Sequence, residues 1–185
     1  MVVEVGGAHA GQEDLEGVEI TEGVKRRPIA VVPFGWEGNT PEVPTDVSSV
    51  IAADLERSGR FRTIPEEDML QKPTSGADMD FSDWSMLDVE AVVVGRVQQT
   101  AENAYSVQFQ LFDVYGRKQL VGYRIPASRG TMRRAAHRLA DMIYEELTGI
   151  AGVFDTRVTY VTAEERRDGK LYSLIVADAD GYNEH

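Results

Sequence analysis

Two short apolar runs dominate the pattern of hydrophobic positions along the chain. Residues 27–34 read Arg-Pro-Ile-Ala-Val-Val-Pro-Phe, and residues 91–97 read Ala-Val-Val-Val-Gly-Arg-Val. Continuous β-branched runs of this length are typical of strands that are buried on both faces of a sheet. Pro28 and Pro33 predict that the first strand extends in neither direction, because proline cannot donate a hydrogen bond to a strand ladder.

A helix and a third strand follow the first run. A loop is expected over residues 35–44, and Thr45 or Asp46 is expected to cap the helix that follows it. Gly59 is placed to end this helix, and residues 61–64 read as a short strand. This order predicts two neighbouring strands joined by a crossing helix. The apolar face of the helix consists of Val47, Val50, Ile51 and Leu55.

The middle of the chain predicts a short helix and a hairpin. One helical turn is expected at residues 65–70, and Ser82 is a candidate cap for a short helix that contains Trp84. Residues 104–112 and 119–125 then alternate apolar and polar side chains on either side of a turn at residues 115–117. Such alternation is typical of a hairpin with one solvated face.

The longest helix is expected from Thr131 to Leu147, with Gly149 as its stop signal. Its outer face carries a local basic group of Arg133, Arg134, His137 and Arg138, which we interpret as a solvated face rather than a binding patch. The apolar stripe on its inner face consists of Met132, Ala135, Ala136, Leu139, Ile143 and Leu147.

The last part of the chain changes character. Two alternating stretches at residues 156–163 and 171–177 are joined through Asp168-Gly169, which is a strong hairpin signal. No helical pattern accompanies this hairpin. We therefore interpret it as the first part of an all-β domain.

These patterns predict an α/β fold in which helices cover a β-sheet. A flexible N-terminal segment precedes this fold, and an incomplete all-β hairpin follows it. We expect three parts: a partner-binding leader at residues 1–26, the α/β domain at 27–155, and the hairpin at 156–185.

The leader holds a few spaced aliphatic residues among acidic ones, and residues 18–22 alternate apolar and polar side chains. A segment of this kind is suited to adding a strand to the sheet of a partner. A disordered tail and a permanently paired strand are the alternatives. Ala8-His9-Ala10 has the shape of a signal-peptidase site, and we interpret it equally as an ordinary loop.

Composition narrows the choice of partner. The net charge of −12 argues against nucleic acid, which needs a positive protein field. The absence of cysteine excludes disulfides and thiolate metal sites. No apolar run is long enough to span a bilayer, so no direct membrane insertion is expected.

Catalytic signatures are absent from the sequence. It has no phosphate-binding glycine loop and no nucleophile elbow, and its three histidines, His9, His137 and His185, lack the spacing of metal ligands. Asp178-Ala179-Asp180-Gly181 starts like a calcium loop but is better explained as a turn. We therefore expect no cofactor and no enzyme activity. The alternative is a small-molecule-binding or enzymatic domain that uses the loop at residues 34–46.

Four sequence pieces together resemble the TolB family. They are Arg-Pro-Ile-Ala-Val-Val-Pro-Phe at 27–34, Ile-Ala-Ala-Asp-Leu-Glu-Arg-Ser-Gly-Arg-Phe at 51–61, Val-Val-Val-Gly at 92–95, and Glu-Leu-Thr-Gly-Ile-Ala-Gly-Val-Phe-Asp-Thr-Arg at 146–157. The resemblance covers about residue 15 to the end, where the turn at residues 178–183 also matches.

The resemblance implies a periplasmic, non-enzymatic adaptor of the Tol–Pal system. It implies an α/β domain, with a mixed β-sheet that carries its helices on one side. A six-bladed β-propeller follows this domain, and this chain holds the first strands of the propeller. The final hairpin is therefore expected to be mobile or packed on a surface other than its usual one. Pal binding is expected only of the full-length protein with its propeller.

The resemblance also implies the partner of the leader. The C-terminal domain of TolA is expected to bind residues 11–26. The binding residues implied are Leu15, Val18, Glu19, Ile20, Gly23 and Val24.

Overall fold

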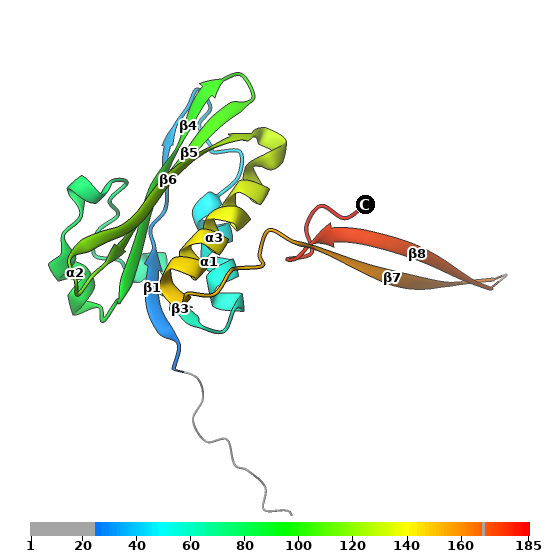
Figure 1. Cartoon of the computed structure of the whole chain (residues 1–185). Coiled ribbons are helices and arrows are strands. Elements are labelled where there is room, and N and C mark those ends of the chain that lie inside the picture. The colour runs from blue at the N-terminus through cyan, green and yellow to red at the C-terminus, as the bar shows by residue number, and fades with distance from the viewer. Residues whose placement is uncertain (1–24, 168) are drawn as a thin grey trace, which may run out of the picture.

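A computed structural model of the protein describes residues 25–167 and 169–185. Figure 1 shows an α/β body, built from β1 to α3, and a two-stranded hairpin that projects from it. No helix within the described residues is both long and apolar enough to cross a membrane.

The body is built on a six-stranded mixed sheet, which confirms the predicted fold class. The first strands pair in parallel and the later ones antiparallel, so β1 and β3 are the neighbours that the strand–helix–strand pattern predicts. The strand order is β3 (Phe61–Thr63), β1 (Arg27–Val31), β4 (Ala91–Ala101), β5 (Ala104–Asp113) and β6 (Lys118–Ser128), and β2 (Gly35–Glu37) also pairs with β4.

The prolines limit the first strand less than predicted. Pro28 lies within β1, beside Arg62 of β3. Beyond Pro33 the chain returns to the sheet as β2, which pairs in parallel with residues 96–98 of β4. The expected loop therefore starts with a short strand, because Pro33 interrupts the ladder only locally.

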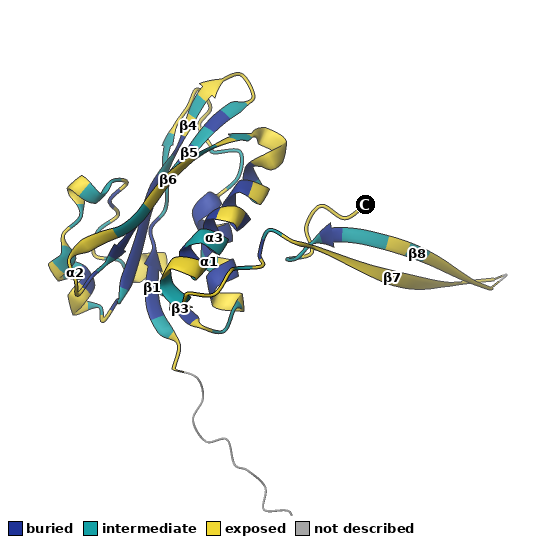
Figure 2. Cartoon of the chain, viewed as in Figure 1, coloured by how far each residue is buried: buried dark blue, intermediate teal, exposed yellow. Residues whose placement is uncertain are grey.

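The sheet has an apolar layer on each face, because adjacent residues of a buried strand point to opposite sides. Ile29 and Val31 belong to one apolar cluster with residues of the helices α1 (Val47–Arg57) and α3 (Met132–Thr148). Figures 1 and 2 show these two helices on the same side of the sheet. Ala30 and Val32 face a second cluster around Trp84. The two long helices thus share one side, as predicted.

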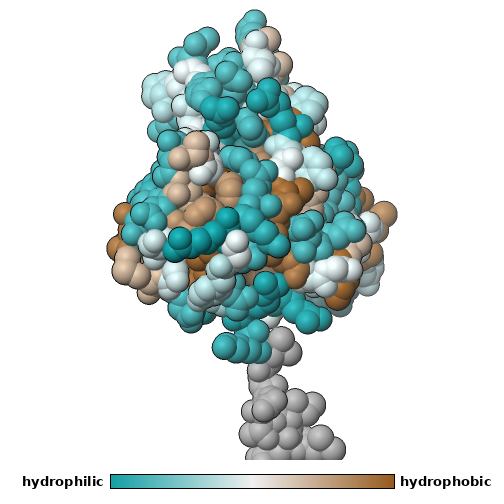
Figure 3. Space-filling model, turned by 60° about the vertical axis from the view of Figure 1, so that its left-hand side comes forward, coloured by the Kyte–Doolittle hydropathy of each residue, from teal (hydrophilic) through white to brown (hydrophobic). Residues whose placement is uncertain are grey.

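The opposite face of the sheet is covered by the short helix α2 (Phe81–Met86) and the loops around it. Figure 3, turned to bring this side forward, shows apolar side chains between hydrophilic ones. The chain also forms 3₁₀ turns at Glu66–Asp68, Gly76–Asp78 and Arg129–Thr131.

Helix ends follow local chemistry. Asp46 caps α1 by accepting the backbone N–H of Ser49, and Gly149 ends α3 with a φ of 71°, a left-handed conformation that glycine adopts without strain. For α2 the predicted cap Ser82 is wrong. Asp80 accepts the Ser82 N–H at 2.8 Å and caps a helix that begins at Phe81, two residues earlier than a cap at Ser82 would place it.

The linker between α3 and the hairpin is fixed on α3. The Asp141 carboxylate accepts the backbone N–H groups of Phe154 and Asp155 at 2.7 and 3.1 Å. The hairpin then forms as predicted, from β7 (Arg157–Arg166) and β8 (Gly169–Asp178). Most of its residues are exposed (Figure 2).

Candidate functional site

The residues expected to bind a partner lie outside the described part of the chain: Leu15, Val18, Glu19, Ile20, Gly23 and Val24. The structure does describe the point at which the leader joins the sheet. The Arg27 guanidinium donates to the Glu90 carboxylate and to the Leu147 carbonyl oxygen, each at 2.7 Å. These bonds tie the start of β1 to the residue before β4 and to the last turn of α3.

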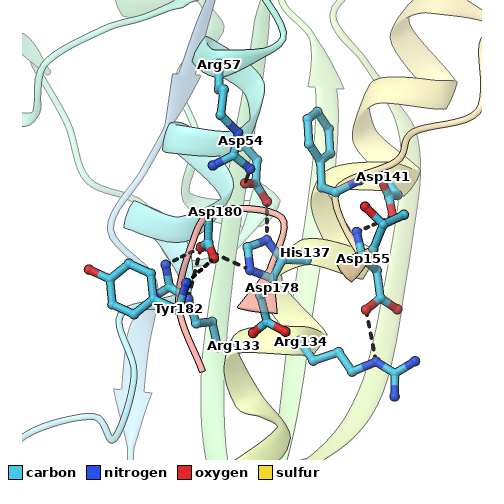
Figure 4. A network of polar contacts seen from close by, with 12 residues as sticks. Asp54, Arg57, Arg133, Arg134, His137, Asp141, Asp155, Asp178, Asp180 and Tyr182 are labelled. Atoms are coloured by element: carbon cyan, nitrogen blue, oxygen red, sulfur yellow. Dashed lines mark hydrogen bonds and ion pairs between the residues drawn. The ribbon is translucent and has the colours of Figure 1, made fainter. Parts of the chain in front are cut away.

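A buried polar cluster lies where α1, α3 and the turn after β8 meet (Figure 4). At its centre is His137 of α3, whose side chain is 2% exposed. Its Nδ1 lies 2.6 Å from Oδ2 of Asp54 in α1, and its Nε2 lies 3.3 Å from Oδ2 of Asp180 in the turn. Asp54 also accepts a 2.6 Å bond from Arg57. The junction cluster, as we name Asp54, Arg57, Arg133, His137, Asp178 and Asp180, joins both long helices to the hairpin.

Arg133 holds the same turn from the side. Its Nε donates to Asp180 Oδ2 at 3.0 Å, and a second guanidinium nitrogen contacts the same oxygen. The guanidinium carbon stands 3.5 Å from the centre of the Tyr182 ring, a cation–π contact that Figure 4 shows at the edge of the cluster. The turn itself is closed by the Gly181 N–H, which donates to the Asp178 carbonyl at 2.8 Å, so the predicted Asp-Gly turn is confirmed.

The electrostatics of the cluster favour charged groups. Burial alone would lower the pKa of His137, but the hydrogen bond to Asp54 and the charges of Asp54 and Asp180 outweigh it and raise the pKa. Burial alone would raise the pKa of Asp180, but the bonds from Arg133 and from the Tyr182 N–H lower it. The charge of Asp180 therefore stabilises the protonated form of His137, and the charge of His137 stabilises the ionised form of Asp180.

The prediction that the basic group on α3 forms a solvated face is wrong for its central member. His137 is buried, Arg133 is paired with Asp180, and Arg134 donates to Asp155 at 2.9 Å. Arg138 is exposed, and it is the one member of this group that forms no ion pair with another described residue. Helical spacing places His137 beside the apolar stripe. The turn that covers it comes from a distant part of the chain. The sequence features that could have pointed to this burial are the acidic residues Asp54, Asp178 and Asp180, which lie beside the histidine only after folding.

Both histidine nitrogens of the junction cluster face carboxylates. His137, Asp178 and Asp180 each bring a ligand atom within 4.8 Å of the others. However, Arg133 holds the Asp180 oxygen that faces Nε2, and the Asn183 amide donates to Asp178. The cluster is therefore an ion-pair network, in which His137 Nε2 lies within ion-pair distance of Asp180 but forms no hydrogen bond with a described residue.

The alternative hypothesis is a small-molecule-binding or enzymatic domain that uses the loop at residues 34–46. This loop borders a pocket of about 220 Å³ between β1 and the start of α1. Asp46 fills the helix N-terminus there, with its carboxylate accepting from the hydroxyls of Ser48 and Ser49 at 2.6 Å each. Burial alone would raise the pKa of Asp46, but these bonds lower it. A charged carboxylate at this position repels anions, so the usual anion site of a helix N-terminus is already taken.

The hairpin exposes apolar side chains on both of its faces. Val161 pairs with Leu174, and the neighbouring pair of Tyr160 and Ile175 points to the other face. Val161 is 61% exposed and Leu174 is 66% exposed. Apolar residues on both faces are typical of a sheet that is covered on both sides.

Comparison with protein families gives one matching model, the TolB amino-terminal domain, over residues 16–120. The Tol-Pal system protein TolB of Nitrosococcus oceani is 48% identical over 170 residues, which are 91% of this chain and 39% of that protein. The protein of the same name from Thioalkalivibrio sulfidiphilus is 44% identical over 178 residues, which are 96% of this chain and 40% of that protein. The chain thus spans about two fifths of the length of these relatives.

A solved structure agrees with these sequences. The crystal structure of TolB from Acinetobacter baumannii superposes with a TM-score of 0.72 at 30% identity, covering 86% of this chain and 38% of that one.

Proposed function

Because this chain belongs to the TolB amino-terminal domain family, we propose that it is a non-enzymatic protein–protein interaction domain of the Tol–Pal system, working in the periplasm. The observation that carries the proposal is the identity of 44–48% to proteins named Tol-Pal system protein TolB over more than nine tenths of the chain.

The partner of the leader is the C-terminal domain of TolA, bound through residues 11–26. Leu15, Val18, Glu19, Ile20, Gly23 and Val24 are the contact residues of this proposal. The alternation of residues 18–22 suits strand addition, in which backbone bonds provide affinity and alternate side chains provide specificity.

The chain divides into the leader at residues 1–26, the α/β domain at 27–155 and the start of an all-β domain at 156–185. Support for the last boundary comes from the hairpin, whose two apolar faces need further strands or neighbouring sheets to cover them. Pal binding belongs to the longer protein that carries that complete domain.

A titration of the isotope-labelled chain with the TolA C-terminal domain of the same organism tests the proposal. Amide shifts concentrated in residues 11–27 are the expected result. Val18→Ser and Ile20→Ser should each weaken binding about tenfold or more, because burying such a side chain contributes about 1.5–3 kcal/mol. Val161→Ser, an exposed apolar residue of the hairpin, is the matched control and should bind like the unmodified chain.

Shifts confined to the α/β body, or equal weakening by Val161→Ser, would contradict the assignment of the leader as the binding segment. Absence of any shift at high TolA concentration would contradict TolA as the partner.

A further inference from the structure

The junction cluster contains a histidine whose charge is fixed by its two neighbours. Nδ1 of His137 is 2.6 Å from an Asp54 oxygen, and Nε2 is 3.3 Å from an Asp180 oxygen. A neutral imidazole carries only one N–H. With that proton on Nδ1, the lone pair of Nε2 would face the Asp180 carboxylate. With it on Nε2, the lone pair of Nδ1 would face Asp54 at 2.6 Å. Only the imidazolium presents a donor to both carboxylates.

Burial strengthens these interactions. The side chains of Asp54, His137 and Asp180 are 1%, 2% and 7% exposed, and opposite charges attract more strongly where they are shielded from water. Protonation of the histidine places a positive charge between two of the three carboxylates of the cluster. The other cations, Arg57, Arg133 and Arg157, lie beside Asp54, Asp180 and Asp178 respectively, and Arg157 Nε is 3.9 Å from Asp178.

We propose that the His137 imidazolium is a latch that holds the Asp178–Tyr182 turn of the hairpin on helices α1 and α3, and that loss of its proton loosens the turn. Asp54 holds the histidine within the α/β body, and Asp180 is the carboxylate of the turn with which the imidazolium pairs (Figure 4). Arg133 grips the same carboxylate, so deprotonation weakens the hold on the turn without removing it. The latch is independent of which partner the leader binds.

Linkage gives the direction of the pH dependence. The latched state raises the pKa of His137 above its ordinary value of 6.5, so the latch is complete below that value and is lost as the pH rises through the raised pKa. The latched state lowers the pKa of Asp180 below 3.8, so the grip also fails in acid, as the pH falls through the lowered pKa. Each unit of the His137 pKa that Asp180 provides corresponds to a tenfold stronger latch in the protonated form.

The first experiment measures the charge of the histidine. NMR titration of the His137 ring, assigned with His9→Gln and His185→Gln, gives its pKa in the unmodified chain and in Asp180→Asn. A lower pKa in Asp180→Asn is expected. Glu164→Gln, which removes an exposed 3.1 Å ion pair with Arg166 at the far end of the hairpin, is the control and should leave the pKa unchanged.

The second experiment measures the position of the hairpin. The chain has no cysteine, so spin labels on Met86→Cys and Leu174→Cys, both at exposed positions, report the distance between α2 and the hairpin. We expect a narrow distance distribution at pH about 6 that broadens at pH about 9, and a broad distribution at both values in Asp180→Asn. Tryptophan fluorescence, to which both Trp36 and the buried Trp84 contribute, verifies that each variant retains the α/β body.

Two results would overturn the latch. One is an equal His137 pKa with and without the Asp180 charge. The other is a distance distribution that stays the same while His137 loses its proton.

Discussion

At the residue scale, Gly95 lies at a point in β4 where no side chain fits. A Cβ atom at this position would stand 2.5 Å from the backbone oxygen of Gln108 and 2.6 Å from the ring of Phe34. The contact with backbone cannot be relieved by turning a side chain. Sequence alone gave the glycine no such role, because the crowding comes from two other elements.

Gly95→Ala should therefore destabilise the fold. Overpacking of this kind costs about 1–3 kcal/mol, and thermal or urea unfolding followed by circular dichroism measures it. Gly130→Ala is the matched control, since a Cβ there meets nothing within 4 Å, and its stability should stay within about 0.5 kcal/mol of the unmodified chain. Equal stability of the two variants would show that β4 and β5 can move apart at Gly95.

His137 illustrates a different limit at this scale. Its neighbours in sequence are three arginines, and a helical wheel places it beside them at the border of the apolar stripe. The structure buries it under a turn more than 40 residues away, so its environment is anionic rather than basic. Long-range contacts decided both its burial and its charge.

At the scale of elements, helix α1 depends on its first turn. Asp46 accepts the Ser49 N–H at 3.0 Å and the hydroxyls of Ser48 and Ser49 at 2.6 Å. Sequence left Thr45 and Asp46 as equal candidates for this cap, and the structure selects Asp46.

Asp46→Ala should lower the free energy of unfolding by about 1 kcal/mol at neutral pH, while Thr45→Ala, the other candidate, should have little effect. The lowered pKa of Asp46 sets the sign of the pH dependence. Its contribution is present above the ordinary value of 3.8 and disappears as the pH falls through the lowered pKa. The difference between Asp46→Ala and the unmodified chain should therefore shrink in acid. A constant difference across this range would mean that the charge of Asp46 is not involved.

Along most of their length, the strands of the hairpin are not packed against helices or further strands of the described chain, in contrast to the strands of the body. The base of the hairpin is held by Asp180 and by Asp155, whereas most of β7 and β8 is exposed. We expect its amide hydrogens to exchange much faster than those of β4 and β5, because local opening of an exposed ribbon breaks few packing contacts.

Hydrogen exchange followed by NMR at neutral pH measures this difference, with the amides of β4 as the internal reference. Protection of β7 and β8 equal to that of β4 would contradict the expectation and would show that the hairpin is buried in solution.

At the scale of the whole molecule, the described residues of the body form an apolar layer on each face of the sheet. Arg27 fixes the start of β1 through Glu90 and Leu147.

Deleting residues 11–24 should therefore leave the melting temperature nearly unchanged while abolishing TolA binding. Differential scanning calorimetry and the TolA titration measure the two effects. A large fall in melting temperature would identify the leader as a fixed strand of the domain, and retained TolA binding would place the binding segment elsewhere.

The sequence by itself determined most of the helices and strands and which of their faces are apolar. Strand burial follows from β-branched runs, helix faces from 3.6-residue spacing, and turns from glycine and aspartate, and each of these signals is local. The family resemblance, carried by residues such as those at 27–34 and 146–157, led to the same fold, and the comparisons confirm it. The leader residues from Leu15 to Val24 remain a prediction from sequence.

Only the tertiary structure decided what lies between elements. It showed the return of the chain to the sheet as β2, the cover of the second face by α2, and the meeting of Asp54, His137 and Asp180 across 126 positions of sequence, from residue 54 to residue 180. Such contacts depend on how helices and turns pack in three dimensions, and no periodicity along one segment encodes them. For this reason the sequence alone left the junction cluster, which joins the body to the hairpin, unrecognised.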